Sequence, residues 1–333
     1  MSLPATQKAA FAPQLSESVD GIVYGDIETP KIESPDDVIV KNKYAGVNFI
    51  ESYFRKGIYP AQFPYVFGRE AAGHVVAVGA NVTRFQPGDV VAYLSPRSFA
   101  QYTKFSQNHV QVRRLASDVL DAQLRLWGSL LVQGLTAITF AHEAYEVKKG
   151  DFILVWAAAG GVGQILTLYA AHLGAHVIAV ASTDEKLAIA RSLGASYVIR
   201  LDEDVAKRVL EITGGVGVAA SFDGIGKDTF EASMASLARK GSMVSYGNAS
   251  GVVPPVSINR LSAKNIKLLR PQVFGYVTTA EEWEHYTNIL QEALDKNVID
   301  VKTTVYPLEE YREAAAALEG RKTTGKLVLA IPE

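Results

Sequence analysis

The first third of the chain alternates short runs of β-branched and aromatic residues with turn-forming residues. Each run has the length of one strand and is bounded by Gly, Pro, Asn or Asp. The runs are Asp37 to Asn48, Glu70 to Gly79, Gly88 to Tyr93 and Phe99 to Phe105. This pattern predicts a compact antiparallel β region without a long helix before about Asp118. Helices are predicted next, over Asp118 to Trp127 and Leu130 to Tyr145.

From Gly150 onward, apolar strands alternate with segments whose apolar residues recur at helical spacing. The predicted strands are 152–156, 176–181, 197–199, 218–223, 242–247 and 265–269. The predicted helices between them are 164–173, 184–195, 205–213 and 227–241. Alternation of this kind predicts an α/β fold with a parallel, doubly wound sheet that helices cover on both faces. The set of strands matches a two-half dinucleotide-binding fold.

Past Pro271 the pattern changes again. We predict a helix from Ala280 to about Asn297, the extended segment 301–308, a helix from Glu309 to Leu318 and a last strand over Lys326 to Ile331. These final pieces resemble the first third more than the middle. The sequence therefore predicts one β-rich domain built from residues 1–127 and 271–333, with a nucleotide-binding domain, residues 128–270, inserted into it.

Composition narrows the class of protein. The chain has 333 residues, of which 48% are hydrophobic and 20% charged, and a formal net charge of −2. These values are typical of a globular protein with an ample core and give no sign of a strongly basic or acidic partner. The sequence contains no cysteine, which excludes disulfides, thiolate catalysis and every cysteine-containing zinc site. Glycines and polar residues interrupt the apolar runs 126–141 and 152–181, so we expect buried elements and no membrane span.

The stretch Lys149 to Gly163, KGDFILVWAAAGGVG, has the order turn, apolar strand, Gly-rich bend and helix start. In that context the bend lets backbone N–H groups approach a pyrophosphate at the positive end of a helix dipole. The pattern G-x-G-x-x-G falls on Ala158, Gly160 and Gly163, so alanine replaces the first glycine. The alternative is an ordinary tight turn between a buried strand and a helix.

The end of the second strand of this unit indicates which dinucleotide is bound. An NAD site normally places Asp or Glu there to hold the ribose 2′-OH. This chain has Ala181, Ser182 and Thr183, followed by Asp184 and then Lys186. Hydroxyl donors and a cation suit a 2′-phosphate, whereas a carboxylate would repel it. We therefore expect NADPH rather than NADH. Ser182 or Thr183 could instead serve as a helix N-cap, and both roles are compatible.

A catalytic metal is not expected. Gly68 to Val75, GREAAGHV, resembles the G-H-E-x-x-G-x-V signature of medium-chain dehydrogenases, but Arg69 stands where the zinc alcohol dehydrogenases have a ligand histidine. The histidines show no ligand spacing; they are residues 74, 109, 142, 172, 176 and 285. Without a Lewis acid, the acceptor must be polarised by hydrogen bonds or be reactive by itself. This points to an easily reduced acceptor such as a quinone or an activated enone.

Several longer blocks resemble the zeta-crystallin-type NADPH:quinone oxidoreductases, which are zinc-free members of the medium-chain dehydrogenase/reductase superfamily, and the fungal members in particular. The blocks are Ala45 to Pro60, Pro64 to Gly79, Gln133 to Ala137, Ala157 to Gly163, Ser245 to Gly251 and Arg270 to Tyr276. The resemblance implies a Rossmann domain inserted in a GroES-like catalytic domain. It also implies NADPH-dependent, metal-independent hydride transfer to quinones, ortho-quinones among them.

By position, the resemblance implies the following site. Asn48 and Tyr53 would face the nicotinamide and the substrate, with Tyr53 as proton or hydrogen-bond donor. The cofactor residues it implies are Gln133 and Thr136 near the nicotinamide, Gly160, Gly161, Val162 and Gly163 on the pyrophosphate, Ser182, Thr183 and Lys186 on the 2′-phosphate, Asn248 after a strand end, and Arg321 from the C-terminal segment. Relatives carry a tyrosine against adenine where this chain has Arg200, which could stack instead. The alternatives are a packed aromatic ring beside Phe54 for Tyr53 and a turn residue for Asn48.

Other functions stay open at this point. An enoyl or alkenal reductase of the same superfamily would use the same cofactor. The resemblance also includes proteins that bind AU-rich RNA and proteins with a structural role in the lens, although this chain has no basic run interleaved with aromatics. We further expect at least a homodimer, formed through the sheet edge of the nucleotide domain. The N-terminus lacks the pattern of a signal peptide, which favours the cytoplasm, with the nucleus as the alternative.

Overall fold

The computed structural model describes residues 3–333, which divide into two compact units. The first contains the residues up to Val132, together with Val277–Thr287 and Lys302–Glu333. The second contains Gln133–Tyr276 and Asn288–Val301. The division falls at 132/133 rather than 127/128, and residues 288–301 group with the second unit. The close approach of Gly134 to Leu290, where an added Cβ would lie 2.9 Å from the leucine side chain, ties this segment to that unit.

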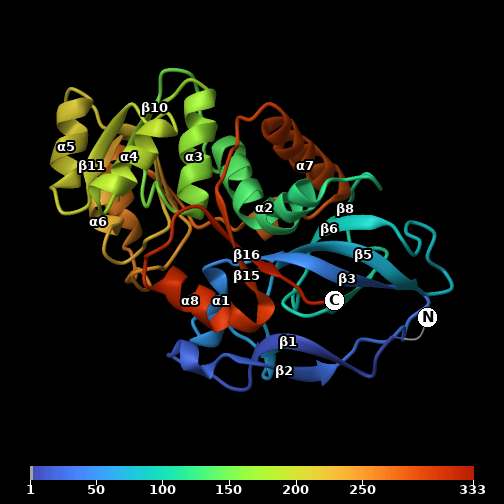
Figure 1. Cartoon of the computed structure of the whole chain (residues 1–333). Helices are drawn as coiled ribbons and strands as arrows, with labels where there is room; N and C mark the ends of the chain where they lie inside the picture. Colours follow the sequence, from blue (N-terminus) through green and yellow to red (C-terminus); the bar gives the residue numbers. More distant parts are fainter. Residues whose placement is uncertain (1–2) are drawn as a thin grey trace. The chain divides into compact units, whose positions relative to one another are not determined.

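The first unit is built on two sheets, which Figure 1 shows in blue, cyan and red. A small sheet has the order β2-β1-β4, and a larger one the order β15-β16-β3-β5-β6-β8, with β7 also paired to β3. The strands are β1 (Thr6–Ala12), β2 (Val23–Glu28), β3 (Asp37–Gly46), β4 (Tyr65–Val66), β5 (Glu70–Val78), β6 (Val90–Leu94), β7 (Tyr102–Ser106), β8 (Val112–Arg114), β15 (Thr303–Pro307) and β16 (Lys326–Ala330). Strands β1 and β2 were not predicted from the sequence.

The last strand lies inside the larger sheet. β16 pairs in parallel with β15 and antiparallel with β3, where Val328 is opposite Gly46. This pairing shows that both ends of the chain build one domain. The pairing also places the start of β16 beside the end of β3. β5 starts beside the same point, because Ala71 is opposite Ala45.

Short helices complete the first unit. They are η1 (Val19–Gly21), α1 (Ile50–Arg55), η5 (Leu308–Glu310) and α8 (Tyr311–Glu319). The core of the unit combines inward-facing residues of β3, β5 and β6 with Tyr311, Ala314 and Ala315 of α8. α1 follows β3 directly and carries Tyr53.

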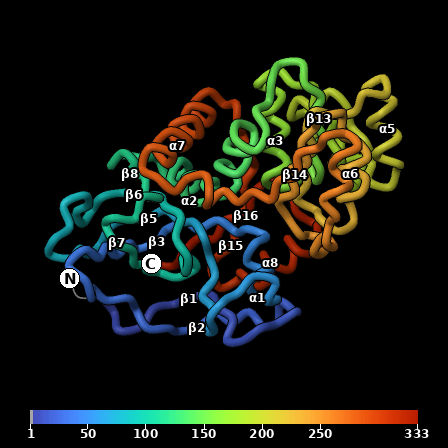
Figure 2. Tube along the Cα trace, turned by 180° about the vertical axis from the view of Figure 1, so that it is seen from behind, coloured from blue at the N-terminus to red at the C-terminus, as the bar shows by residue number. Residues whose placement is uncertain are grey.

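The second unit has a six-stranded, wholly parallel sheet with the order β11-β10-β9-β12-β13-β14. Its strands are β9 (Phe152–Val155), β10 (His176–Ala181), β11 (Tyr197–Arg200), β12 (Val218–Asp223), β13 (Leu237–Ser245) and β14 (Lys267–Leu269). This order is that of the two-half dinucleotide-binding fold, so the predicted α/β fold class is confirmed. Figure 2 shows β13 beside β14, the last strand of the sheet.

Helices cover both faces of this sheet. They are α3 (Gly161–His172), α4 (Asp184–Ser192), α5 (Val205–Ile212) and α6 (Phe230–Ser236), with the short helices η3 (Ile258–Lys264) and η4 (Val273–Gly275) farther on. α3 connects β9 to β10 and α4 connects β10 to β11, so the chain moves toward the β11 edge of the sheet. α5 connects β11 to β12 and α6 connects β12 to β13, so the chain moves toward the opposite edge. Right-handed crossovers therefore place the two pairs on opposite faces, and α5 indeed packs against α6.

Three predicted helices differ from the structure. The helices expected over 118–127 and 130–145 form one continuous helix, α2 (Asp121–Thr139), which ends in the π-helical turn η2 (Phe140–Ala144). Gly128 does not break this helix, because its missing side chain lets the helix approach the carbonyl oxygen of Tyr44. The helix expected over 227–241 ends at Ser236, and residues 237–241 belong to β13. Lys240 has a φ of 68°, which an α-helix does not accommodate.

Helix α2 continued by η2 is long and apolar enough to cross a membrane by length and composition alone. However, 89% of its most apolar window is buried within the protein, as expected of a core helix. The remaining helix, α7 (Ala280–Asp295), is amphipathic and places Trp283, Tyr286 and Leu290 in buried positions.

Candidate functional site

The turn between β9 and α3 is held in place by backbone contacts. Gly160 N–H donates to the carbonyl oxygen of Ala157, and Ala158 N–H donates to Val180 of the neighbouring strand β10 at 3.0 Å. The residue in the left-handed region is Ala157, with a φ of 50°, and not Ala158. The position of the missing first glycine therefore does not require a positive φ, and this explains why alanine is accepted there.

The glycines of the turn serve different purposes. A Cβ at Gly163 would overlap the carbonyl oxygen of Ala157, so this glycine permits the close packing of helix against strand. Gly160 is the N-cap of α3, and within residues 3–333 no side chain caps that helix start. The first N–H groups of α3, at Gly161, Val162 and Gly163, are consequently available as donors at the positive end of the helix dipole. This cradle fits the predicted pyrophosphate.

Gln133 and Thr136 lie on α2 and are largely buried, with exposed fractions of 9% and 7%. Gln133 Oε1 lies against Gly161, so closely that a Cβ on the glycine would overlap it. In the part of the chain that the structure describes, this buried oxygen has no hydrogen-bond partner. A buried acceptor without a donor costs free energy, which a ligand N–H or O–H would recover.

The predicted 2′-phosphate residues gather after β10. Ser182 is exposed and Lys186 half-buried, and Thr183 caps α4 by accepting from the Lys186 N–H at 3.3 Å. Arg200, at the end of β11, pairs with Asp184 at 3.2 Å and with Asp202 at 3.0 Å. The N-cap expected as the alternative is therefore present, the phosphate role stays a prediction, and the charge of the nearby Asp184 is balanced by an arginine.

The ends of β12 and β13 meet in a second loop region. The buried carboxylate of Asp223 accepts from the N–H groups of Ile225 and Gly226 and from the hydroxyls of Thr229 and Ser233. Burial raises the pKa of Asp223, and these donors oppose that shift. The bonds fix the loop that follows β12.

Asn248 lies in the adjacent loop after β13. Arg270 donates to the carbonyl oxygens of Ser245 and Gly247 at 3.0 Å, and Ser250 N–H donates to Ile225 at 2.8 Å. Asn248 itself is 7% exposed. Neither Asp223 nor Arg270 was predicted as a site residue from the sequence. A carboxylate at the end of an apolar strand is the signal that could have marked Asp223 as a loop anchor.

In the first unit, Tyr53 lies on α1 within a cluster of aromatic rings. Its ring centroid is 5.6 Å from that of Phe49 and 5.3 Å from that of Tyr59, and only 6% of the residue is exposed. The alternative interpretation of Tyr53 was a packed aromatic ring beside Phe54. The ring is packed, but its partners are Phe49 and Tyr59. Such packing restricts the ring and does not conflict with a role for the hydroxyl.

Asn48 follows β3 and is also largely buried, with 5% exposed. Its Nδ2 donates to Glu70 Oε1 at 2.7 Å and to the carbonyl oxygen of Gly46 at 3.1 Å. Its Oδ1 accepts from Lys326 Nζ at 2.8 Å. The residue is therefore held by a buried ion pair, and neither partner in that pair was singled out from the sequence.

Arg69, in the position of a zinc-ligand histidine, packs its guanidinium 4.2 Å from the centre of the Phe54 ring. It donates to the Tyr65 hydroxyl at 3.4 Å, and that hydroxyl donates to Glu51 at 3.1 Å. Burial raises the pKa of Glu51, with Arg69 acting in the opposite direction. Among residues 3–333 there is no group of three His, Cys, Asp or Glu side chains arranged to hold a metal ion.

The structure thus divides the predicted residues into two sets. Asn48, Tyr53 and Arg321 belong to the first unit, where Arg321 is exposed after α8 with a φ of 57°. The predicted residues from Gln133 to Asn248 belong to the second unit. Most of them follow the carboxyl ends of its strands or begin α3, and Gln133 of α2 lies against Gly161. That edge is where ligands bind in open α/β sheets.

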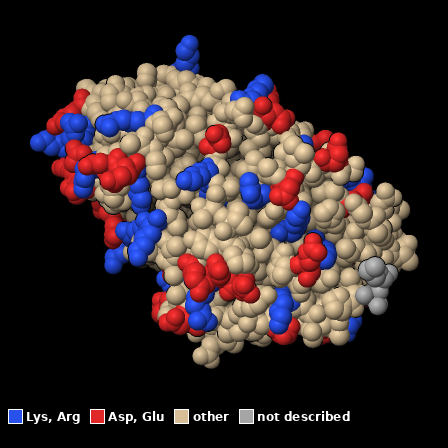
Figure 3. Space-filling model, viewed as in Figure 1, with Lys and Arg blue, Asp and Glu red and all other residues tan. Residues whose placement is uncertain are grey.

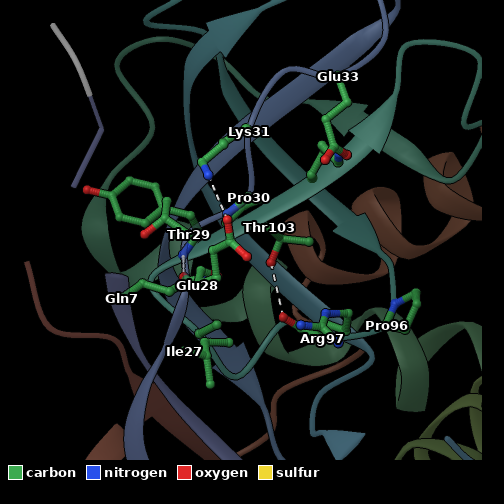
Figure 4. Close-up of a pocket in the computed structure, with 13 residues that line it drawn as sticks. Gln7, Ile27, Glu28, Thr29, Pro30, Lys31, Glu33, Pro96, Arg97 and Thr103 are labelled. Atoms are coloured by element: carbon green, nitrogen blue, oxygen red, sulfur yellow. Dashed lines mark hydrogen bonds and ion pairs between the residues drawn. The ribbon is translucent and has the colours of Figure 1, made fainter. Parts of the chain in front are cut away.

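A cavity of about 320 Å³ lies elsewhere in the first unit (Figure 4). Its lining includes Glu28, Lys31, Glu33, Arg97 and Lys104, and contains none of the predicted site residues. Lys31 pairs with Glu28 at 2.6 Å and Lys104 pairs with Glu33. Because most of its charged groups already satisfy one another, we do not assign the cofactor or substrate to this cavity.

Comparison with known proteins identifies the family. Residues 34–147 match the alcohol dehydrogenase GroES-like domain, and residues 161–292 match the zinc-binding dehydrogenase family. A probable quinone oxidoreductase of Schizosaccharomyces pombe is 43% identical over 306 residues, which cover 91% of each chain. The chain belongs to the quinone oxidoreductase family. This confirms the resemblance seen in the sequence, including its similarity to a fungal member.

Two further relatives bear on the site. The Escherichia coli quinone oxidoreductase, solved in complex with NADPH, superposes with a TM-score of 0.90 at 32% identity and covers 97% of this chain and 99% of its own. A 2-haloacrylate reductase from Burkholderia sp. is 35% identical over 318 residues, 93% of this chain and 95% of its own. The relatives of this chain therefore include proteins named for different acceptors.

Proposed function

We propose that this quinone oxidoreductase family member transfers hydride from NADPH to a quinone without a metal ion. The observation that carries the proposal is the second unit's ligand-binding edge. There an uncapped helix start, with glycines that admit a close backbone approach, lies beside a strand end that offers hydroxyls and a lysine. The NADPH-bound relative from Escherichia coli supports the choice of cofactor.

The second unit would hold the cofactor. The backbone N–H groups of Gly161, Val162 and Gly163 donate to the pyrophosphate, and Gly160 leaves that approach open. Ser182, Thr183 and Lys186 bind the 2′-phosphate. Asp184 does not oppose this phosphate strongly, because its carboxylate is paired with Arg200.

The nicotinamide end would be positioned by Gln133, Thr136 and Asn248. The unsatisfied Oε1 of Gln133 offers an acceptor for a ligand N–H or O–H. Arg321 supplies a further cation for a phosphate.

When bound, NADPH supplies the hydride. Tyr53 would donate a hydrogen bond, and finally its proton, to the quinone oxygen on which negative charge develops, so that hydride and proton together give the hydroquinone. The tyrosinate would regain a proton from solvent before the next turnover. Asn48 orients the reacting groups. Burial of these side chains keeps water from competing for the same hydrogen bonds.

A titration of NADPH against NADH tests the cofactor, and turnover of an ortho-quinone after treatment with a chelator tests the reaction. We expect tighter binding of NADPH and undiminished turnover after chelation. Binding of NADH alone, or loss of activity with the chelator that zinc restores, would contradict the proposal.

The second candidate is an NADPH-dependent enoyl or alkenal reductase. The 35% identity to a 2-haloacrylate reductase favours it, because that acceptor is an activated alkene. Comparison of kcat/KM for a quinone and for an enone decides between the two. A higher value for the enone would assign the second function.

We also propose a homodimer formed at the edge strand β14. This strand ends the sheet, and the exposed apolar residues Val252, Ile258 and Leu268 lie on the same part of the chain. An exposed edge with apolar neighbours favours pairing with a second copy. Sedimentation of the wild type and of Ile258→Asp tests it: the wild type should be dimeric and the variant more dissociated.

AU-rich RNA binding is the remaining alternative from the resemblance. On the face shown in Figure 3, acidic and basic side chains are interspersed, which does not favour it. RNA binding that falls steeply with salt and competes with NADPH would support that role. We place the activity in the cytoplasm, with the nucleus as the alternative, and a fluorescent fusion distinguishes the two.

A further inference from the structure

Glu70 and Lys326 form an ion pair inside the first unit. The Lys326 Nζ lies 2.9 Å from Glu70 Oε1, and both side chains are 0% exposed. Glu70 is the first residue of β5 and Lys326 the first residue of β16. In the larger sheet both strands start beside the end of β3. The ammonium group donates in addition to the carbonyl oxygen of Val47 at 2.9 Å and to Asn48 Oδ1.

Stability alone does not account for such a pair. Desolvation of two charges offsets much of their attraction, and apolar residues of similar volume often stabilise a fold equally well. Burial lowers the pKa of Lys326, which is the sign of this desolvation, while Glu70 opposes the shift. What a buried ion pair adds is a fixed direction for the polar groups around it.

The amide of Asn48 contacts both charged groups. Its oxygen faces the ammonium of Lys326 and its nitrogen faces the carboxylate of Glu70. The flipped amide would place oxygen against carboxylate and N–H against ammonium, which is repulsive at both ends. The ion pair therefore selects one of the two orientations.

This orientation decides what Asn48 can offer to a ligand. Both hydrogens of its Nδ2 are used, by Gly46 and Glu70, and one of the two lone pairs of Oδ1 is used by Lys326. The remaining capacity is one lone pair on Oδ1. Asn48 can thus accept a hydrogen bond from a ligand O–H or N–H, but it has no hydrogen left to donate.

Glu70 also contacts helix α2. Its second oxygen accepts the N–H of Val132 at 2.7 Å, and Val132 directly precedes Gln133 in the chain. One buried carboxylate therefore holds both the Asn48 amide and the peptide of the helix next to a predicted cofactor residue.

We propose that Glu70 and Lys326 are positioning residues for hydride transfer, which fix Asn48 as a hydrogen-bond acceptor for a hydroxyl or amide of the bound substrate or cofactor. The proposal rests on the function proposed above, in which Asn48 faces the reacting groups. Neither charged side chain touches the ligand; both act through the Asn48 amide.

A double-mutant cycle tests this. Glu70→Gln, Asn48→Leu and the combination of both are compared with the wild type by kcat and KM for an ortho-quinone at saturating NADPH. Glutamine at position 70 can present either its oxygen or its nitrogen to the Asn48 amide. Lys326 is then the only charged group that orients this amide, so the orientation is held less firmly. We expect Glu70→Gln to lower kcat/KM roughly tenfold or more. In the Asn48→Leu background the same change should have less than about a twofold effect, because the residues act as one unit.

A matched control separates positioning from stability. Tyr93→Phe removes a buried hydrogen bond to Asn42 from the same unit, and Tyr93 has no part in the proposed site. We expect its kcat and KM to equal those of the wild type at a temperature where thermal unfolding shows every variant to be folded. If Glu70→Gln does not fold, Glu70→Gln/Lys326→Met replaces it, since that variant buries no uncompensated charge.

The double variant should then fold and still lose kcat/KM. Additive effects in the cycle, or wild-type kinetics in Glu70→Gln/Lys326→Met, would overturn the inference while leaving the quinone reductase activity intact. A wild-type protein that reduces neither quinone nor enone would instead remove the proposed function, and this inference with it.

Discussion

Gln133 Oε1 occupies the space in which a Cβ of Gly161 would lie. The oxygen is buried and has no hydrogen-bond partner in the described chain. All three atoms nearest to that Cβ position belong to the end of the flexible Gln133 side chain. Two residues later the situation differs, because the atom that a Cβ of Gly163 would meet is the backbone oxygen of Ala157. The two glycines therefore tolerate alanine to different degrees.

Gly163→Ala should lower the free energy of unfolding by about 1–3 kcal/mol and weaken NADPH binding, because the turn must shift to admit the methyl group. Gly161→Ala should change stability by less than about 1 kcal/mol, since Gln133 can move aside and alanine favours the helix. Urea unfolding and NADPH fluorescence titrations of both variants measure these effects. Equal losses in the two variants would contradict the assigned roles.

Lys186→Glu should weaken NADPH binding roughly tenfold or more and leave NADH binding nearly unchanged, because only NADPH carries the 2′-phosphate. Arg191→Glu is the control, since this exposed residue lies on the same helix at its far end. Titrations with both nucleotides provide the measurement. Equal loss for NADPH and NADH would mean that Lys186 does not contact the phosphate.

Tyr53→Phe removes the hydroxyl and keeps the ring that packs on Phe49 and Tyr59. We expect kcat for an ortho-quinone to fall about 100-fold with little change in thermal stability. Tyr44→Phe, which loses a hydroxyl bond to Asp121 of 2.8 Å, should retain full activity. Unchanged turnover in Tyr53→Phe would leave Tyr53 with a packing role only.

Glu51→Gln should stabilise the protein more at pH 8 than at pH 5. Burial raises the pKa of Glu51 above its ordinary value, so the folded state keeps the proton that the unfolded state has lost. The wild type therefore loses stability as the pH rises from the ordinary pKa to the raised one, by about 1.4 kcal/mol for each pH unit that separates the two pKa values. Glutamine does not titrate. Unfolding temperatures of both proteins at the two pH values measure the difference, and a constant difference would contradict the raised pKa.

The order of the elements was predictable because its signals are local. The apolar strands of the second unit are short runs, most of them separated by helical segments, and all six appear in the sheet. The absence of a carboxylate directly after β10 is equally local. The errors at Gly128 and at residues 237–241 arose where tertiary packing outweighed local preference: a glycine allowed close contact, and a chain with helical periodicity turned into a strand.

The sequence by itself determined the domain pattern, the glycine turn and the lack of thiol chemistry, since each follows from neighbouring residues or from composition. Only the tertiary structure decided that Glu70, Lys326 and Asn48 are one buried group. Glu70 and Lys326 are 256 positions apart, and no local sequence pattern indicates that the two residues form a pair. The protonation and orientation of a buried polar group depend on the charges that the fold places around it, and those come from distant strands.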